Sequence, residues 1–334
     1  MKTPHHCLRL VSATALSLLL AIPGIAAEPA DPAESTAIRA FSERVAKRHD
    51  LSADAIERLI SDEARYEPAI IEAINRPAEA LPWHRYRDIF LTEARIAGGL
   101  EFRRRHQQWL EAVETQYGVP AEIVVAIIGV ETFYGRYTGD YRVIDALRTL
   151  GFGYPARGEF FRDELEAFLV LTREEDIDPT TPLGSYAGAM GVPQFISSSY
   201  RAYAIDFNDN GRRDLFSEPA DAIGSVGHYL SRHGWQAGAP IAVPAELDGS
   251  GWRSRLRPSL EPVDTVATLA SAGVSPERPL AAGLDARLLE LQAETGARHW
   301  VTLRNFYAIT RYNHSSLYAM AVHQLADAIR EAGS

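Results

Sequence analysis

Cysteine is almost absent from this sequence of 334 residues, since the single cysteine is Cys7. It precedes the apolar run at residues 10–25, whereas the cysteine of a lipoprotein follows such a run, so we expect no lipid anchor. Basic residues before the run, and Ala26 and Ala27 after it, are typical of a secretory signal, which we place at residues 1–27. Once that segment is removed, disulfides, a thiol nucleophile and a cysteine-ligated metal are excluded.

Several catalytic motifs are also missing. The 10 histidines form no H-E-x-x-H pair, and no G-x-S-x-G turn occurs, which disfavours a zinc hydrolase and a serine hydrolase. The glycine-rich segments lack the lysine of a phosphate loop and the spacing of a dinucleotide fingerprint. Acidic residues outnumber basic ones by 44 to 34, and the formal net charge of −10 argues against a nucleic-acid partner. A weakly charged polymer such as a polysaccharide is permitted.

Apolar residues spaced three and four apart predict helices along much of the chain, including one long helix over 92–117. From residue 238 to about 301, proline, glycine and short apolar pieces alternate, which predicts a small β-containing unit. We therefore expect a mainly α fold of the α+β class. Its parts would be a helical N-terminal subdomain at 28–85, a catalytic core at 86–237, the β-containing unit at 238–300 and a closing segment at 301–334.

The most informative stretch is an apolar helical pattern at 123–130 that ends at Glu131. Ile127 and Ile128 share the face of Glu131, and the opposite face is apolar as well. A helix that is apolar on all sides is buried, so Glu131 is expected in or beside the interior. Burial favours the protonated carboxyl, the form that a general acid needs. The alternative is a glutamate in the last turn that reaches solvent or pairs with Arg136.

Two further segments have the composition of a ligand site. Small residues surround Met190, where the backbone could come close to a ligand. Gln194 could hydrogen-bond a sugar and Phe195 could stack on it, although a tight turn that begins a helix is the alternative. The segment 311–318 is dense in polar aromatic residues, and tyrosines suit carbohydrate because each offers a stacking face and a hydroxyl. Tyrosines packed in the core are the alternative there.

Residues 206–214 match the first nine positions of a calcium-binding loop, with Gly211 at the sixth position. Ser217 stands at the twelfth position in place of a bidentate glutamate, so Glu218 and Asp221 are the alternatives for the last ligand. We expect a weakly bound structural calcium ion rather than an Asx-rich turn. The expected ligands are Asp206, Asn208, Asn210, the carbonyl of Arg212, Asp214 and Asp221.

Taken in order, the motifs resemble the lytic murein transglycosylase B family, which has a goose-lysozyme-like core. The resemblance extends from about Phe41 to the C-terminal helix. It is carried by R-P-A-E from Arg76, P-W-H-R-Y from Pro82, A-I-I-G-V-E-T from Ala126, G-S-Y-A-G-A-M-G from Gly184, D-A-I-G-S-V from Asp221, H-G-W from His233 and R-Y-N from Arg311.

The resemblance implies a lysozyme-like helical core in which Glu131 is the only catalytic acid and base. Glu131 would protonate the oxygen that links N-acetylmuramic acid to N-acetylglucosamine. As a carboxylate it would then accept the proton of the 6-hydroxyl that attacks C1, which leaves a 1,6-anhydromuramoyl end and requires no cofactor. The sugar sites would be formed by Tyr86, Arg157, Ser185, Met190, Gln194, Phe195, Tyr229, Tyr312, Asn313 and Tyr318, with Arg157 near the peptide stems.

Two other functions stay open from the sequence. A hydrolytic muramidase on the same core would need a second carboxylate, for which Asp140 and Asp145 are candidates. A glycan-binding protein of the cell wall would need no catalysis. We expect a periplasmic monomer whose partners are peptidoglycan strands and cell-wall synthesis or remodelling proteins, with no nucleic acid.

Overall fold

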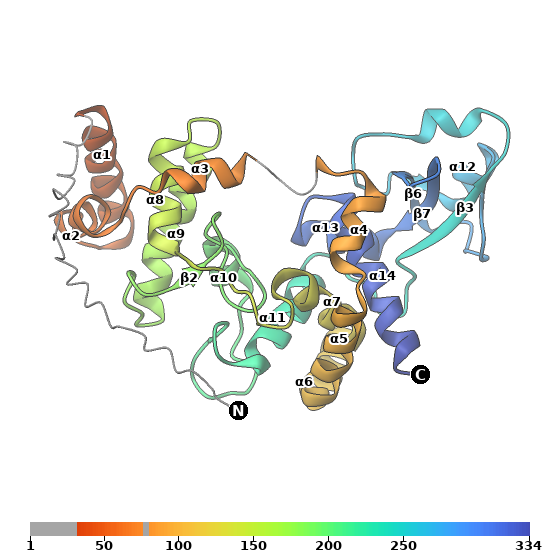
Figure 1. Cartoon of the computed structure of the whole chain (residues 1–334), viewed down its shortest axis with the longest axis horizontal. Coiled ribbons are helices and arrows are strands. Elements are labelled where there is room, and N and C mark those ends of the chain that lie inside the picture. Colours follow the sequence, from red (N-terminus) through yellow and green to blue (C-terminus); the bar gives the residue numbers. More distant parts are fainter. Residues whose placement is uncertain (1–31, 76–79) are drawn as a thin grey trace, which may run out of the picture.

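The computed structural model describes residues 32–75 and 80–334. The predicted signal peptide at 1–27 and the motif at 76–79 lie outside these described residues. The predicted mainly α fold is confirmed, because strands within the described residues are confined to two small sheets. Helices pack around a large apolar core, and the larger sheet lies at one end of the long axis (Figure 1).

The helical end of the molecule is opposite the larger sheet (Figure 1). It consists of α1 (Pro32–His49), α2 (Ala53–Arg58), the π-helical turn η1 (Leu59–Glu63), α3 (Pro68–Ile74), α8 (Val143–Gly153) and α9 (Gly158–Glu174). The side chain of Ser52 accepts a hydrogen bond from the backbone N–H of Ala55 and so caps α2. Ile38, Phe41 and Val45 are buried along one face of α1, which packs against α8 and α9.

The centre of the molecule consists of helices from distant parts of the chain. These are α4 (Trp83–Phe90), α5 (Glu93–Arg105), α6 (Gln107–Tyr117), α7 (Ala121–Thr132), α10 (Ser197–Tyr203), α11 (Pro219–Arg232), α13 (Arg304–Tyr312) and α14 (Ser316–Ala332). Every residue from 123 to 130 of α7 is buried, and α7 contacts α5, α6, α11 and α14. The surrounding helices therefore fix the position of the last turn of α7.

The prediction of one helix over 92–117 is wrong. The segment forms α5 and α6, which meet at His106, whose backbone (φ −116°, ψ 24°) leaves the helical region. The bend lets Val113 of α6 pack on Gly227 of α11, where a Cβ would lie 2.4 Å from the valine side chain. No Pro or Gly marks the bend, so tertiary packing determines it.

In the described part of the chain no single helix is long and apolar enough to cross a membrane. The pair α6 and α7, which is bent by 116°, would be long and apolar enough only if both helices are counted together.

The larger sheet has two covered faces. Its strands are β3 (Ala242–Leu247), β4 (Asp264–Thr265), β5 (Val274–Pro276), β6 (Asp285–Gln292) and β7 (Ala297–Leu303), all antiparallel in the order β4-β6-β7-β3-β5. On one face, Ala286 and Leu288 join a small core with α12 (Val266–Ser271), beside the short helix η3 (Gly251–Arg255). On the other face, Leu289 and Leu291 join the helical core. The alternation of strand side chains thus attaches the sheet to the body.

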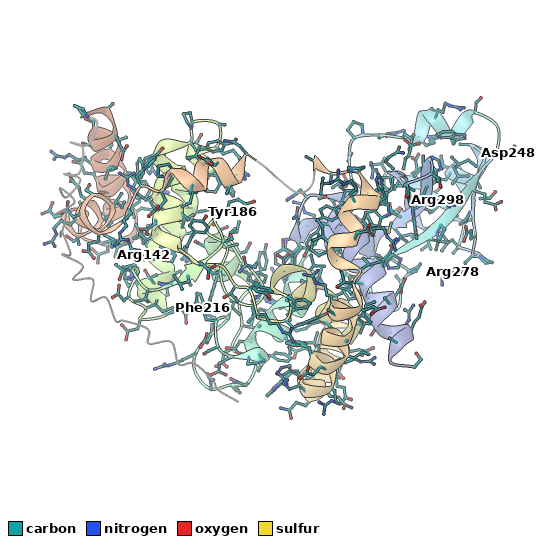
Figure 2. The ribbon with its side chains drawn as sticks, viewed as in Figure 1. Arg142, Tyr186, Phe216, Asp248, Arg278 and Arg298 are labelled. Atoms are coloured by element: carbon teal, nitrogen blue, oxygen red, sulfur yellow. The ribbon has the colours of Figure 1, made fainter. Side chains whose placement is uncertain are left out.

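A second sheet of two strands pairs β1 (Tyr141–Arg142) with β2 (Leu183–Gly184) next to α8. Arg142 lies towards the helical end, whereas Asp248, Arg278 and Arg298 lie on the larger sheet unit (Figure 2). The segments around α7 that build the candidate site lie between these two ends.

Candidate active site

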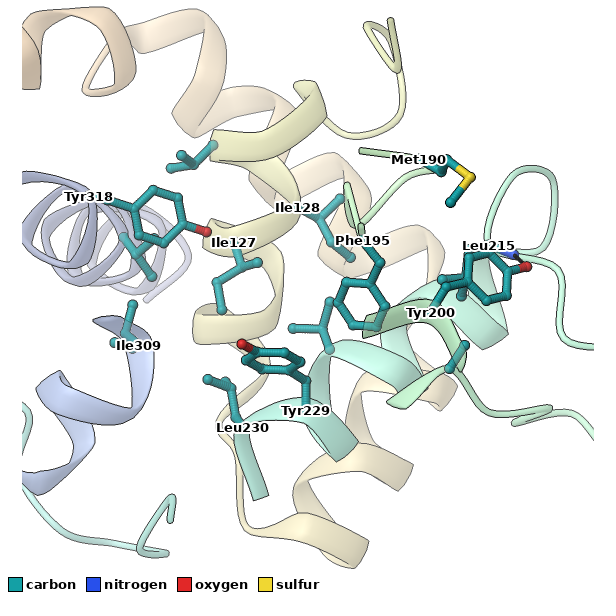
Figure 3. Packing of buried hydrophobic residues seen from close by; sticks show 14 of the residues in the cluster. Ile127, Ile128, Met190, Phe195, Tyr200, Leu215, Tyr229, Leu230, Ile309 and Tyr318 are labelled. Carbon is teal, nitrogen blue, oxygen red and sulfur yellow. Dashed lines mark hydrogen bonds between the residues drawn. The ribbon is translucent and has the colours of Figure 1, made fainter. Parts of the chain in front are cut away.

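Glu131 is the next-to-last residue of α7 and is half-buried. The hydroxyl of Tyr318, on α14, donates a hydrogen bond to Oε1 of Glu131 at 2.6 Å. In Figure 3 the hydroxyl of Tyr318 points toward α7, near Ile127. The carboxyl is therefore oriented by a side chain 187 residues further along the chain.

A second tyrosine extends this contact. The rings of Tyr312 and Tyr318 stack with centroids 6.3 Å apart, and the hydroxyl of Tyr312 donates to the carbonyl of Pro193 at 2.6 Å. Burial, and after it the negative charge of Glu131, raises the pKa of both tyrosines well above 10. Both hydroxyls therefore stay protonated and act as donors beside the carboxyl.

The turn after Glu131 has an unusual backbone. Phe133 (φ 49°) and Tyr134 (φ 64°) are left-handed without being glycine, and Gly135 (φ 82°) continues the run. The hydroxyl of Thr132 holds the turn, because it accepts from the N–H of Gly135 at 3.0 Å and donates to the carbonyl of Val192 at 2.9 Å. Thr132 and Tyr134 were not predicted as part of the site, since in this segment only a glycine, Gly135, is typical of a left-handed conformation.

The ring of Tyr134 fits into a notch formed by glycines. A Cβ on Gly98, Gly99 or Gly129 would lie 2.7 to 2.9 Å from the side chain of Tyr134. The hydroxyl of Tyr134 also donates to the carbonyl of Arg95 at 2.7 Å. These contacts fix the strained turn, and with it the end of α7 that carries Glu131.

The glycine-rich segment faces this turn through Gln194. Its amide nitrogen donates to the carbonyls of Thr138 at 2.9 Å and Gly191 at 3.0 Å, so only its oxygen can be offered to a ligand. Met190 and Phe195 exchange backbone hydrogen bonds and are 1% and 2% exposed. Burial leaves the side chain of Met190 little surface to offer a sugar, whereas Phe195, although mostly covered, lines the cavity that adjoins the stacked tyrosines (Figure 3).

A cavity of about 480 Å³ adjoins the stacked tyrosines. Its lining includes Gln194, Tyr229, Tyr312 and Arg157, whose guanidinium lies 4.4 Å from the ring centre of Phe160. Burial raises the pKa of Tyr229, whose hydroxyl donates to the carbonyl of Arg311. His233 and His314 also line the cavity and were not predicted. Aromatic faces and polar groups together suit a saccharide.

The other predicted sugar-site residues lie around the two tyrosines or in the glycine-rich turn. Tyr86 is buried on α4, where its ring lies 5.1 Å from that of Phe90, and it interacts electrostatically with Tyr318. Asn313 is half-buried at the end of α13. The hydroxyl of Ser185 accepts from the N–H of Ala189 at 3.1 Å and so closes the glycine-rich turn.

The calcium-type loop has a partly suitable set of oxygens. Asp206 accepts from the N–H groups of Asn210 and Gly211. The amides of Asn208 and Asn210 point at the carboxylate of Glu218, at 2.5 and 2.8 Å, and Oδ1 of Asn208 is buried without a hydrogen-bond partner. If the oxygen and nitrogen atoms of these two side-chain amides are assigned the other way round, both amide oxygens lie beside the carboxylate of Glu218. All three groups could then bind one cation.

Asp214 and Asp221 bond to backbone instead. Oδ1 of Asp214 accepts from the N–H of Phe216 at 2.8 Å, and Asp221 accepts from the N–H groups of Phe207 and Asp214, both at 2.8 Å. Their expected role as ligands is therefore not supported, and Glu218 is the better candidate. No three His, Cys, Asp or Glu side chains converge among the described residues, so an ion would depend on the asparagines and on carbonyls such as that of Arg212.

A carboxyl oriented by a tyrosine at the end of a buried helix, beside a cavity that suits a saccharide, fits an enzyme that cleaves glycosidic bonds. A family model described as "Transglycosylase SLT domain" matches residues 33–327, and the chain belongs to this family. The predicted family and the lysozyme-like fold are thereby confirmed.

Individual relatives agree with this assignment. The chain is 40% identical over 298 residues to the membrane-bound lytic murein transglycosylase B of Escherichia coli (strain K12), covering 86% of this chain and 81% of the relative. The structure of SltB1 from Pseudomonas aeruginosa matches with a TM-score of 0.84 and 44% identity, over 89% of this chain and 98% of the other. Escherichia coli Slt35 in complex with calcium matches with a TM-score of 0.80 and 40% identity, over 89% and 93%. The protein is an enzyme of the lytic transglycosylase type.

Proposed function

We propose that this enzyme cleaves peptidoglycan strands with Glu131 as its single acid and base. The observation that carries the proposal is the hydrogen bond from Tyr318 to Glu131, in a chain of the transglycosylase family. A carboxyl held in one orientation can donate a proton to a glycosidic oxygen and later accept one.

The proposed reaction uses this carboxyl twice. Glu131 donates its proton to the oxygen between N-acetylmuramic acid and N-acetylglucosamine, and the bond from that oxygen to C1 breaks. The N-acetyl group of the muramic residue stabilises the cationic C1. The 6-hydroxyl of the same residue then attacks C1 and passes its proton to Glu131. A 1,6-anhydromuramoyl end forms, the acid is regenerated and no water is consumed.

A hydrolytic muramidase is less well supported. It would need a second carboxylate to activate water. Both oxygens of Asp145 already bond to Arg142, at 2.6 and 2.8 Å, and Oδ1 also accepts from the N–H of Arg65. Asp140 is exposed beyond the strained turn. The other alternative function is a glycan-binding protein without catalysis. It would give no role to the carboxyl of Glu131 that Tyr318 orients.

We infer a structural calcium ion at the loop 206–218, held by Asp206, Asn208, Asn210, the carbonyl of Arg212 and Glu218. The buried, unpartnered oxygen of Asn208 supports this inference, as does the complex of Slt35 with calcium. The ion would stabilise the loop and take no part in bond cleavage.

We further infer that residues 1–27 direct the chain to the periplasm, where its substrate is located, and that it acts there as a monomer. The name of the Escherichia coli relative supports a murein substrate. Cell-wall synthesis or remodelling proteins are the expected partners.

Mass spectrometry of soluble products from purified peptidoglycan tests the function. The wild-type enzyme should release anhydromuropeptides, whereas Glu131→Gln, with an unchanged melting temperature, should release none. Reducing muropeptides from the wild type would instead indicate a hydrolase, and substantial activity of Glu131→Gln would refute the role of Glu131.

A further inference from the structure

Four side chains form a surface at the turn that follows Glu131, and the proposed reaction does not use them. They are Tyr137, Phe133, Arg95 and Arg136, which we call the Tyr137 platform. Tyr137 is 72% exposed, more than any other large apolar side chain of the described residues. An aromatic ring so exposed, in the turn that follows Glu131, is available for a ligand.

The platform is ordered by ring and cation contacts. The rings of Phe133 and Tyr137 are nearly parallel, at 16°, with centroids 6.1 Å apart. The guanidiniums of Arg95 and Arg136 lie 4.9 and 4.8 Å from the ring centre of Phe133. Arg95 also lies 5.1 Å from the ring centre of Phe90 and donates to the carbonyl of Ile89. The result is one exposed aromatic ring, that of Tyr137, stacked on a ring that carries two guanidinium groups.

The two guanidiniums are suited to bind an acid. No ion pair within the described residues includes Arg95 or Arg136. In addition, Nε of Arg95 is buried without a hydrogen-bond partner. A guanidinium without an acidic partner is a common recognition group for carboxylates.

None of the four platform side chains lines the 480 Å³ cavity, although Gln194, which does, donates to the carbonyl of Thr138 next to Tyr137. The backbone N–H of Tyr137 donates to the carbonyl of Thr132, the neighbour of Glu131, at 3.0 Å. Phe90 connects the platform to Tyr86, which interacts with Tyr318. The cavity, by contrast, adjoins Tyr318 through Tyr312. A strand cleaved at Glu131 continues on both sides of the broken bond, so a second binding surface is required.

We propose that the Tyr137 platform binds a muramic acid residue of the strand outside the 480 Å³ cavity. The sugar ring stacks on Tyr137, and the carboxylate of its lactyl group binds Arg136 and Arg95. The inference rests on the proposed function, because it takes the peptidoglycan strand as the ligand.

Binding is measured in the Glu131→Gln background, where turnover does not interfere. Two probes of equal length are compared: a tetrasaccharide of alternating N-acetylglucosamine and N-acetylmuramic acid, and chitotetraose, which lacks lactyl groups. Tyr137→Ala should weaken both about tenfold, because it removes the stacking face. Arg136→Gln should weaken only the muramic acid probe. The control Tyr66→Ala removes a 45% exposed tyrosine under Arg148, 5.4 Å away, and should change neither affinity.

The proposal is overturned if Tyr137→Ala binds the muramic acid probe as tightly as its parent, or if Tyr66→Ala loses as much affinity. It is also overturned if Arg136→Gln weakens both probes equally. Failure of the proposed function has a different signature, namely the release of reducing muropeptides by the wild type. The affinities would then still decide whether the platform binds glycan.

Discussion

At the scale of single residues, the proposed site depends on one hydrogen bond between two helices. Tyr318 orients the carboxyl of Glu131 and cannot compete with it for a proton, because burial and the charge of Glu131 raise the pKa of the phenol well above 10. The hydrogen bond therefore positions the carboxyl of Glu131, and no proton passes from the phenol to it.

We predict that Tyr318→Phe lowers kcat ten- to a hundredfold with little change in KM, because a hydrogen bond to a charged group is worth roughly 1.5–3 kcal/mol. The release of soluble anhydromuropeptides over time measures both constants. Tyr200→Phe is the matched control, since that buried hydroxyl donates to the carbonyl of Arg213, in a different contact. An equal loss of kcat in both variants would mean that packing, not orientation, is responsible.

The sequence identifies Glu131 because an apolar helix that ends in a carboxylate is a local pattern. It identifies Tyr318 only through family resemblance, since nothing local connects side chains 187 residues apart. Met190 shows the opposite case. The small residues around it suggest sugar contact, but burial is a property of the whole fold and leaves its side chain only 1% exposed.

At the scale of elements, the strained turn after α7 is held by the fit of one ring into a glycine notch. A methyl group on Gly129 would lie 2.7 Å from the hydroxyl of Tyr134. We predict that Gly129→Ala displaces the turn, destabilises the protein by about 1–3 kcal/mol and lowers kcat about tenfold. Denaturant unfolding and product release measure these effects. Gly283→Ala, where a Cβ meets nothing within 4 Å, should change neither, and an equal effect of the two variants would contradict the role of the notch.

The helices are largely predictable from the spacing of apolar residues, and so are the strand-forming pieces between 241 and 303. The bend at His106 is not, because its cause is the contact of Val113 with Gly227 on another helix. The left-handed run is not predictable either, because Phe133 and Tyr134 rarely adopt that conformation and only tertiary contacts hold them there.

The calcium-type loop gives a prediction at the same scale. Millimolar calcium should raise the melting temperature of the wild type, because an ion that binds only the folded state stabilises it by about 2.7 kcal/mol at a hundredfold excess over Kd. Glu218→Gln removes the one carboxylate that faces both asparagines and should abolish this response with little effect on the metal-free protein. A wild type that melts at the same temperature with calcium and with chelator would rule out the site.

At the scale of the whole molecule, an ion cluster joins the N-terminal helix to the body. Glu166 on α9 accepts from Arg48 and His49 of α1, both at 2.7 Å. Burial acts to raise the pKa of Glu166, but these two hydrogen bonds outweigh it and leave the pKa below 4.5. A carboxyl whose pKa is lower in the folded state stabilises the fold when the pH is above its pKa in the unfolded state. This contribution is lost as the pH falls through its pKa in the folded state.

We therefore predict that Glu166→Gln lowers the free energy of unfolding by roughly 1–3 kcal/mol at pH 7. The difference between variant and wild type should shrink below pH 4.5, because the carboxyl of the unfolded wild type is protonated there and that of the folded protein follows at lower pH. Urea unfolding at pH 7, 5 and 3.5 measures both effects. Glu57→Gln is the control, because its partner Arg39 has a side chain that is 67% exposed and such surface pairs contribute only about 0–1 kcal/mol. If the two variants lost equal stability at pH 7, or if the Glu166→Gln difference persisted unchanged at pH 3.5, the buried cluster would not be what anchors α1.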